Sequence, residues 1–281
     1  MKKILVTGAT GFIGRYVIQS LLKQEVMIIA SSRSISPTGI FNHPRIQVKN
    51  FDLHQQQKSH NLFEYFEQPD ALIHLAWEGL PNYKQAFHIE KNLPAHKQFL
   101  YNLIENGLTD ITVSGTCFEY GMQEGSLNES MPALPGNFYA QAKDALRQAL
   151  ELFRQKQHFS LKWIRLFYMY GEGQHPQSLI PQLDAALEKG ALIFNMSGGE
   201  QTRDFMPVEK VAAAIVKIAL QKKVEGIINV SSNTPITVKQ FVLDHLRSKN
   251  KDIRLNLGFY PYPDFEPMHF WGDNSKLNSI K

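Results

Sequence analysis

The sequence has a single cysteine and no long apolar run, and both shortages limit what the protein can be. Cys117 is the only cysteine among 281 residues, so the chain forms no intrachain disulfide, and we expect no metal site. Lys2 and Lys3 precede an apolar run of only three residues, too short for the core of a signal peptide. No stretch of about 18 apolar residues is present, so we expect no membrane span. These features predict a soluble, cytoplasmic protein without membrane contact.

Blocks of like charge are also missing. The formal net charge is +4, and no run of lysine and arginine forms a basic stripe. Binding to nucleic acid is therefore disfavoured, whereas a phosphorylated small ligand is compatible with the charge. Hydrophobic residues make up 43% of the chain and charged residues 20%, a composition typical of globular proteins.

The most informative motif lies at the start of the chain, in residues 3–14. A short β-branched run leads into Gly8, Gly11 and Gly14 at three-residue spacing, and an amphipathic pattern follows. This order predicts a strand, a tight turn and a helix, with backbone N–H groups and the positive helix end facing an anion. We assign the pyrophosphate of a dinucleotide to this turn, with Thr10, Phe12 and Ile13 as further cofactor contacts.

Apolar runs and helical patterns alternate along most of the chain. We expect strands at 4–6, 26–30, 46–51, 71–76, 111–114 and 161–168, and helices at 12–23, 83–105 and 137–155. This alternation predicts an α/β fold with a doubly wound parallel sheet, the Rossmann arrangement. Glycine and proline become frequent after residue 171, and one helix–strand pair follows at 208–220 and 227–230. We therefore divide the chain into a dinucleotide-binding domain at 1–170, with 205–230 returning to it, and a smaller C-terminal substrate-binding lobe at 171–281.

Two further groups of residues carry candidate chemistry. Tyr139 and Lys143 are four residues apart on a predicted helix, so both side chains rise on one face. A lysine cation beside a phenol favours the phenolate, so we expect Lys143 to lower the pKa of Tyr139 and make it a proton donor or acceptor. Thr116 follows a predicted strand, where open α/β sheets bind ligands, and can hydrogen-bond a substrate oxygen beside Tyr139.

Together, the glycine turn, Thr116 before Tyr120-Gly121, and the Tyr139/Lys143 pair resemble the extended short-chain dehydrogenase/reductases. This group contains nucleotide-sugar epimerases, dehydratases and reductases, and the resemblance covers nearly the whole chain. It implies catalytic roles for Thr116, Tyr139 and Lys143, the last two also binding the cofactor. It further implies cofactor contacts at Asp52, Leu53, Leu75 and Ala76, a buried helix asparagine at Asn92, a substrate loop through Tyr168 and Gln174, and a phosphate-binding arginine at Arg203.

Departures from the family pattern narrow the reaction. Dehydratases of the family carry an acidic pair directly after the catalytic threonine, where this chain has Cys117 and Phe118. Glu119 lies one place too late and, on an extended segment, points to the other face. We therefore exclude dehydration. Cys117 borders the substrate as a buried, inert thiol.

The end of the second predicted strand bears on the choice of cofactor. NAD-binding folds place an acidic residue there for the ribose 2′-OH, whereas a 2′-phosphate favours arginine. This chain has Ser32 and Arg33, with no acidic residue between Glu25 and Asp52. We predict NADPH, with NAD(H) as the alternative.

Three segments resemble a subgroup of bacterial nucleotide-sugar 4-ketoreductases, namely 75–83, 115–121 and 266–273. The resemblance implies reduction of a dTDP- or CDP-linked 4-keto-6-deoxyhexose, for surface polysaccharide such as lipopolysaccharide O-antigen. Trp77 either stacks on the substrate or packs in the core. A nucleotide-sugar 4-epimerase with tightly bound NAD is the alternative, followed by a non-catalytic nucleotide-sensing regulator. Relatives pair through the helices expected at 83–105 and 137–155, which implies a homodimer.

Overall fold

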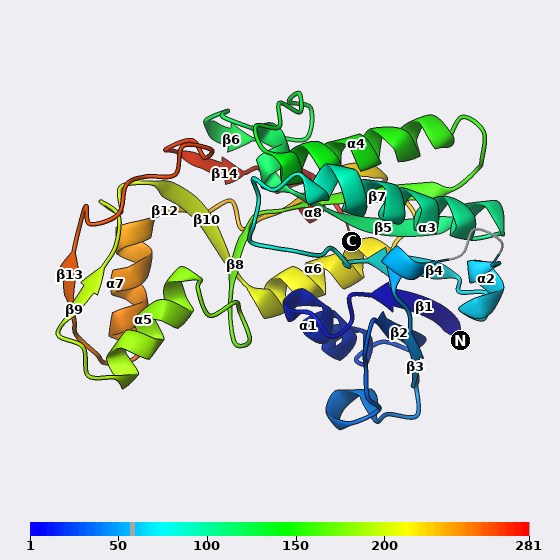
Figure 1. The fold of residues 1–281 in the computed structure, drawn as a ribbon, viewed down its shortest axis with the longest axis horizontal. Helices are drawn as coiled ribbons and strands as arrows, with labels where there is room; N and C mark the ends of the chain where they lie inside the picture. The colour runs from blue at the N-terminus through cyan, green and yellow to red at the C-terminus, as the bar shows by residue number, and fades with distance from the viewer. Residues whose placement is uncertain (57–59, 281) are drawn as a thin grey trace.

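The computed structural model describes residues 1–56 and 60–280, in which a seven-stranded parallel sheet forms the centre of the molecule (Figure 1). Its strands lie in the order β11-β7-β5-β4-β1-β2-β3. They are β1 (Lys2–Thr7), β2 (Val26–Ser32), β3 (Ile46–Asn50), β4 (Ala71–His74), β5 (Asp110–Thr116), β7 (Ser160–Leu166) and β11 (Gly226–Val230). The order reverses between β1 and β4, where doubly wound sheets bind ligands. The predicted α/β doubly wound sheet is therefore confirmed.

Helices cover both faces of this sheet, because side chains alternate along each buried strand. Ile4 and Val6 of β1 pack into one apolar cluster with α1 (Phe12–Leu21) and α6 (Val208–Leu220). Leu5 points the opposite way, into a cluster with α2 (Leu62–Tyr65), α3 (Leu93–Glu105) and α4 (Phe138–Phe153). In Figure 1 α3 and α4 lie in the upper part of the molecule and α1 and α6 below them. None of the helices in the described residues is long and apolar enough to cross a membrane.

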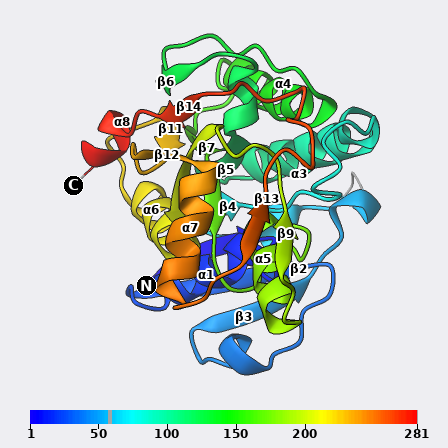
Figure 2. The same cartoon turned by 90° about the vertical axis from the view of Figure 1, so that its left-hand side faces the viewer.

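A smaller lobe lies beyond the carboxyl edge of the sheet and faces the viewer in Figure 2. It has its own apolar cluster, which includes Leu183, Phe194 and Val242. Its three-stranded sheet consists of β8 (Tyr168–Tyr170), β10 (Thr202–Pro207) and β12 (Pro235–Thr237). The lobe also contains the strand pair β9 (Ile193–Asn195) and β13 (Arg254–Asn256), and the helices α5 (Leu179–Glu188) and α7 (Val238–Ser248). A further pair is formed by β6 (Gly125–Leu127) and β14 (Phe270–Gly272). The last helix, α8 (Ser275–Asn278), returns to the central sheet, where Leu277 joins the apolar cluster of α1 and α6.

Most expected elements agree with the observed ones to within about two residues at each end, and two differ in kind. The helix expected at 83–105 begins only at a π-helical turn, η3 (His88–Asn92), which continues into α3. Backbone hydrogen bonds within 79–88 form turns instead, consistent with Gly79 and Pro81 at their start. The strand expected at 161–168 is divided at Phe167, whose ring packs in a separate buried cluster, so that β7 ends before it and β8 starts in another sheet. Short 3₁₀ turns occupy η1 (Gly39–Phe41), η2 (Leu53–Gln55) and η4 (Cys117–Tyr120).

Candidate active site

Two cavities lie along the carboxyl ends of the strands and meet at the first glycine turn. The larger cavity has a volume of about 400 Å³, and the smaller one about 210 Å³. Gly8, Gly11, Leu75 and Trp77 line both of them. The predicted residues in the larger cavity are Phe12, Ile13, Gly14, Thr116, Cys117, Tyr139, Tyr168 and Gln174. Those in the smaller cavity are Thr10, Ser32, Arg33, Asp52, Leu53 and Ala76. The fold therefore gathers most of the predicted residues in one continuous crevice.

In the glycine turn, the backbone at Gly8 lies very close to the backbone at Ala76, after β4. Gly8 has a φ of +69°, and a Cβ placed on it would lie 2.8 Å from the Ala76 amide nitrogen. Helix α1 begins directly after Gly11, with no acidic residue in its first turn and, in the described residues, no side chain capping it. Its first N–H groups and its positive dipole end are therefore available to an anion. These observations fit the pyrophosphate of a dinucleotide.

Tyr139 and Lys143 lie one turn apart on α4, as their spacing predicts. Asn137 caps this helix by accepting a hydrogen bond from the Ala140 amide over 2.9 Å. Tyr139 is 7% exposed and lines the larger cavity. The Lys143 ammonium donates to the Ser114 carbonyl over 2.8 Å and lies 4.0 Å from the centre of a Trp77 ring. Trp77 therefore covers the lysine at the point where the two cavities meet.

Burial controls the pKa values of this pair. Desolvation raises the pKa of Tyr139 well above its usual range, and a hydrogen bond with the Thr116 side chain opposes the rise. Burial lowers the pKa of Lys143 to about 7, with the nearby Glu119 carboxylate acting in the opposite direction. The expectation that Lys143 lowers the pKa of Tyr139 is wrong for this structure, because the loss of hydration dominates. Tyr139 is protonated at neutral pH, which suits a proton donor.

Thr116 ends β5 and caps the following turn. Its hydroxyl oxygen accepts a hydrogen bond from the Phe118 amide over 3.3 Å, so the hydroxyl hydrogen can donate to Tyr139 or to a ligand in the cavity. The adjacent Cys117 is buried, and desolvation raises the pKa of its thiol. A protonated thiol is a poor nucleophile, in agreement with an inert role.

The smaller cavity is lined by exposed polar and charged side chains that follow three strands. Thr10 and Ser32 share a hydrogen bond of 2.8 Å between their hydroxyl oxygens. Arg33 forms an ion pair with Glu78, and the same carboxylate lies 3.3 Å from Nε2 of His54. Sequence reasoning did not identify Glu78, because it comes from the loop after β4. The end of β2 has no acidic residue, but Glu78 places a carboxylate in the same cavity, next to Arg33.

Three predicted residues, Lys143, Asn92 and Arg203, lie outside the lining of both cavities. The Asn92 side chain is buried and donates to the Glu78 carbonyl over 3.0 Å, so it supports the loop that carries Glu78. Arg203 is also buried, and its guanidinium donates to Glu266 over 2.9 Å and to the Met268 carbonyl over 3.1 Å. These contacts direct Arg203 into the protein.

The larger cavity contains further polar groups on the side away from the glycine turn. Gln174 donates to the Met169 carbonyl over 3.0 Å, and its amide oxygen is buried without a hydrogen-bond partner in the described residues. Tyr83, which belongs to the segment 75–83 identified in the sequence, also lines this cavity. His175 and Ser178 line it too but were not predicted, since they lie in turns without a recognisable motif. The Tyr83 carbonyl accepts from the Tyr139 amide over 3.1 Å, so this turn also supports the start of α4.

Two buried histidines fix the strand ends beneath the crevice. His74 hydrogen-bonds Thr7 over 2.8 Å and His96 over 2.7 Å, and His96 stacks on Trp77. Burial lowers the pKa of His74 to about 3, so the ring is neutral at physiological pH. Within residues 1–56 and 60–280, no cluster of histidine, cysteine and carboxylate side chains has the arrangement of a metal site. These histidines therefore serve the packing of β1, β4 and Trp77.

Comparison with known proteins gives a consistent picture. A sequence model described as "NAD dependent epimerase/dehydratase family" matches residues 4–231. A dTDP-6-deoxy-L-talose 4-dehydrogenase (NAD(+)) from Aggregatibacter actinomycetemcomitans is 29% identical over 96% of this chain and 98% of its own. The dTDP-4-dehydro-6-deoxyglucose reductase of Escherichia coli is 24% identical over 85% of this chain and 79% of its own.

Among solved structures, the UDP-glucuronic acid 4-epimerase from Bacillus cereus in complex with UDP-glucuronic acid and NAD shares the fold. It has a TM-score of 0.85 and 24% identity, over 99% of this chain and 92% of that chain.

Proposed function

The chain belongs to the NAD dependent epimerase/dehydratase family, and from this premise we propose that it reduces the C4 keto group of a nucleotide-linked 4-keto-6-deoxyhexose. The observation that carries the proposal is the meeting of Thr116 and the protonated Tyr139 in one cavity, continuous with the glycine turn. The names of the two enzyme relatives, a 4-dehydrogenase and a reductase acting on dTDP-linked 6-deoxy sugars, support this substrate class.

The residues divide the work as follows. Gly8, Gly11 and the first turn of α1 would hold the pyrophosphate, and Lys143 the nicotinamide ribose. When bound, the reduced dinucleotide supplies a hydride to C4 of the sugar. Tyr139 donates its proton to the oxygen at C4 as negative charge develops there, and the Thr116 hydroxyl donates a second hydrogen bond. The carbonyl thus becomes an alcohol.

The remaining substrate contacts come from the other wall of the cavity. The unpartnered amide oxygen of Gln174 can accept a hydrogen bond from a sugar hydroxyl. Cys117, Phe118 and Tyr168 present apolar surface beside Thr116, which suits the methyl group of a 6-deoxy sugar better than a hydroxymethyl group. We also propose that residues 171–281 form most of the substrate lobe, with 205–230 returning to the central sheet.

For the cofactor we propose NADPH, because Ser32 and Arg33 line the smaller cavity and an arginine suits a 2′-phosphate. Glu78 competes for Arg33, so NAD(H) is the alternative.

The test is consumption of NADPH and NADH with dTDP-, CDP-, GDP- and UDP-linked 4-keto-6-deoxyhexoses, with the product at C4 identified by NMR. We expect stoichiometric reduction of at least one of these sugars. NAD that copurifies in equimolar amount and survives dialysis would instead indicate the 4-epimerase. Absence of turnover with every sugar, together with a specific protein partner, would indicate the regulator.

A further inference from the structure

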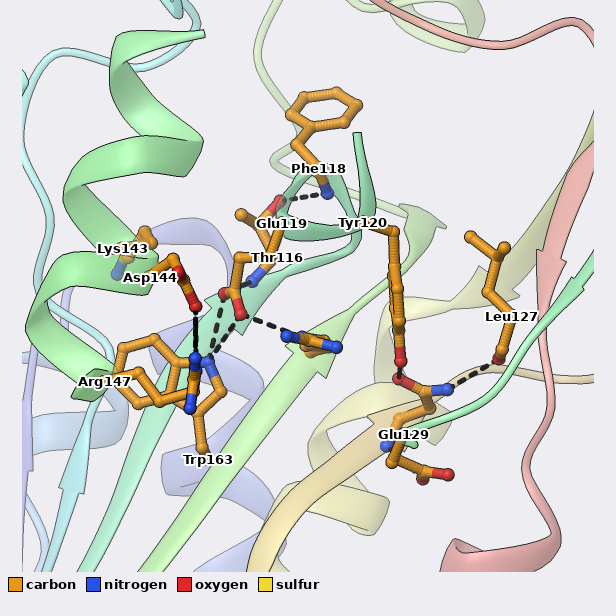
Figure 3. A network of polar contacts seen from close by, with 12 residues as sticks. Thr116, Phe118, Glu119, Tyr120, Leu127, Glu129, Lys143, Asp144, Arg147 and Trp163 are labelled. Atoms are coloured by element: carbon orange, nitrogen blue, oxygen red, sulfur yellow. Dashed lines mark hydrogen bonds and ion pairs between the residues drawn. The ribbon is translucent and has the colours of Figure 1, made fainter. Parts of the chain in front are cut away.

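A fully buried carboxylate lies directly beneath the catalytic threonine (Figure 3). Glu119 has an exposed fraction of 0%, and three groups from two strands donate to it. Its Oε1 accepts from the Thr116 amide over 2.8 Å, and its Oε2 accepts from Nε of Arg165 over 2.8 Å. The indole nitrogen of Trp163 lies 3.0 Å from each carboxylate oxygen. The carboxylate is therefore completely enclosed by protein donors.

The local backbone explains how Glu119 reaches this position. Residues Cys117–Tyr120 form a 3₁₀ turn, not the extended segment that the sequence suggests. Thr116 and Glu119 form a capping box in which the threonine hydroxyl accepts from one backbone amide and the glutamate accepts from the threonine amide. Both the amide and the hydroxyl oxygen of Thr116 are thus held by the same turn, so the direction of its hydroxyl depends on Glu119.

The strand leaves space for this carboxylate at Gly115. A Cβ on Gly115 would lie 2.5 Å from Oε1 of Glu119 and 2.2 Å from the indole nitrogen of Trp163. Real Cβ contacts are not this short, so any larger residue would displace the carboxylate or the indole. The glycine, the threonine and the glutamate therefore form one unit at the end of β5.

The ion pair with Arg165 is poorly explained by stability alone. Arg165 is 1% exposed, its guanidinium stacks 4.2 Å from the Tyr120 ring centre, and its Nη1 has no hydrogen-bond partner in the described residues. Dehydrating two charges costs about as much as their attraction returns, and apolar replacements of such pairs are often neutral or stabilising. What the pair provides is a fixed geometry at the end of β5.

We propose that Glu119 is a positioning residue, which holds Thr116 so that its hydroxyl points at the substrate oxygen. The proposal rests on the proposed function of Thr116 in carbonyl reduction. Glu119 does not touch the cavity, and its effect on the reaction passes through Thr116.

Two variants test this role. Glu119→Gln keeps the size of the side chain but replaces one acceptor with a donor facing Trp163 or Arg165. The double variant Glu119→Val/Arg165→Met removes both charges and leaves no unpaired ion, so its thermal stability should return close to that of the wild type. The matched control is Glu129→Gln, because Glu129 accepts from the Asn229 amide over 2.8 Å in the same region but does not touch Thr116.

We expect kcat to fall about 10- to 100-fold in both Glu119 variants, because a misplaced donor stabilises the developing charge poorly. The KM of the sugar and the Kd of the dinucleotide should change less than about 2-fold, and Glu129→Gln should retain the wild-type kcat. A double variant with both wild-type stability and wild-type kcat would overturn the proposal, because Glu119 would then serve the fold alone.

A second readout does not depend on turnover. Cys117 is the only cysteine and follows Thr116 directly, so the rate at which a disulfide reagent labels its thiol reports on the turn. Far below the melting temperature, labelling should be faster in both Glu119 variants than in wild type or Glu129→Gln. Equal rates would show that Glu119 does not hold the turn. If the wild type reduces no 4-keto sugar, the proposed function fails while the labelling result still decides whether Glu119 fixes Thr116.

Discussion

The two ends of the crevice use charge in opposite ways. At the smaller cavity, Arg33, His54 and Glu78 form an exposed cluster, with 64% of the Arg33 side chain accessible. Beneath the larger cavity, behind Thr116, Glu119 and Arg165 form an ion pair that is almost completely buried. Exposed pairs are worth about 0–1 kcal/mol and rearrange easily, whereas breaking a buried pair costs about 3–5 kcal/mol. If the proposed function holds, the first end can therefore adjust to the dinucleotide, and the second end keeps Thr116 in a fixed position.

The largest effect should come from the buried end, at Tyr139. We expect Tyr139→Phe to lower kcat about 10²- to 10⁴-fold, because the C4 oxygen loses its proton donor. The dinucleotide should bind with nearly unchanged Kd, since the ring and its packing against Trp77 and Tyr83 are retained. Steady-state kinetics and a fluorescence titration with NADPH measure the two quantities. Near-normal turnover in this variant would show that another group donates the proton.

The next effect should come from the glycine turn between the two ends. Gly8→Ala adds a side chain at a positive φ and brings its Cβ to 2.8 Å from the Ala76 amide. The strain should move the turn and weaken dinucleotide binding about 10- to 100-fold, while kcat at saturating cofactor falls much less. Gly39→Ala is the matched control, because Gly39 also has a positive φ but its Cβ would meet nothing within 4 Å. Equal dinucleotide affinities in the two variants would show that the glycine turn does not bind the cofactor.

The burial of Lys143 should make the free energy of unfolding depend on pH, and this dependence can be measured. Its pKa is lowered by burial to about 7 in the folded chain, against 10.5 as the ordinary value. Between these pH values the unfolded chain binds one more proton at this residue, so the lysine adds stability as the pH rises. Above pH 7 the free energy of unfolding of the wild type should therefore rise, relative to that of Lys143→Met, by roughly 1.4 kcal/mol per pH unit.

Urea unfolding between pH 7 and 9.5 measures this slope. Lys97→Met, on the exposed side of α3, controls for the loss of a lysine as such. A difference between Lys143→Met and wild type that stays constant with pH would show that the folded environment leaves the lysine fully hydrated. Turnover should be lost in Lys143→Met whatever its stability, since Lys143 would hold the nicotinamide ribose.

The sequence predicted best the groups of residues that lie close together along the chain. Gly8, Gly11 and Gly14 lie within one turn, and Tyr139 and Lys143 within one helical turn, so spacing alone brings each set together. The alternation of strands and helices likewise gave the parallel sheet. The variants Tyr139→Phe, Gly8→Ala and Lys143→Met test the roles proposed for these residues.

The contacts that the sequence missed connect distant segments or depend on a turn. Arg33 and Glu78 are 45 residues apart, and Arg203 and Glu266 are 63 apart, so no spacing rule relates them. Glu119 points away from the cavity, as its position predicts, but the segment is a 3₁₀ turn and not extended, and this turn directs the carboxylate to the Thr116 amide and Arg165. Tertiary contacts of this kind follow from the order of strands in the sheet, which is known only once the chain has folded.

The smallest effect should come from the exposed end, at Glu78. Removing its charge in Glu78→Gln releases Arg33, which would then be free to bind a 2′-phosphate. Because an exposed ion pair contributes at most about 1 kcal/mol, we expect the Kd for NADPH to tighten about 2- to 5-fold. The Kd for NADH should stay constant or weaken slightly, since it lacks the phosphate. The gain in affinity should shrink as salt rises from 0.05 to 0.5 M, because the Debye length falls from about 14 to about 4 Å and screens the charges.

Glu90→Gln, an exposed change near the start of α3, is the control for loss of a surface carboxylate. An equal change in the affinity for both dinucleotides would mean that Glu78 acts on the shared part of the cofactor, and the exposed end would then set affinity without selectivity.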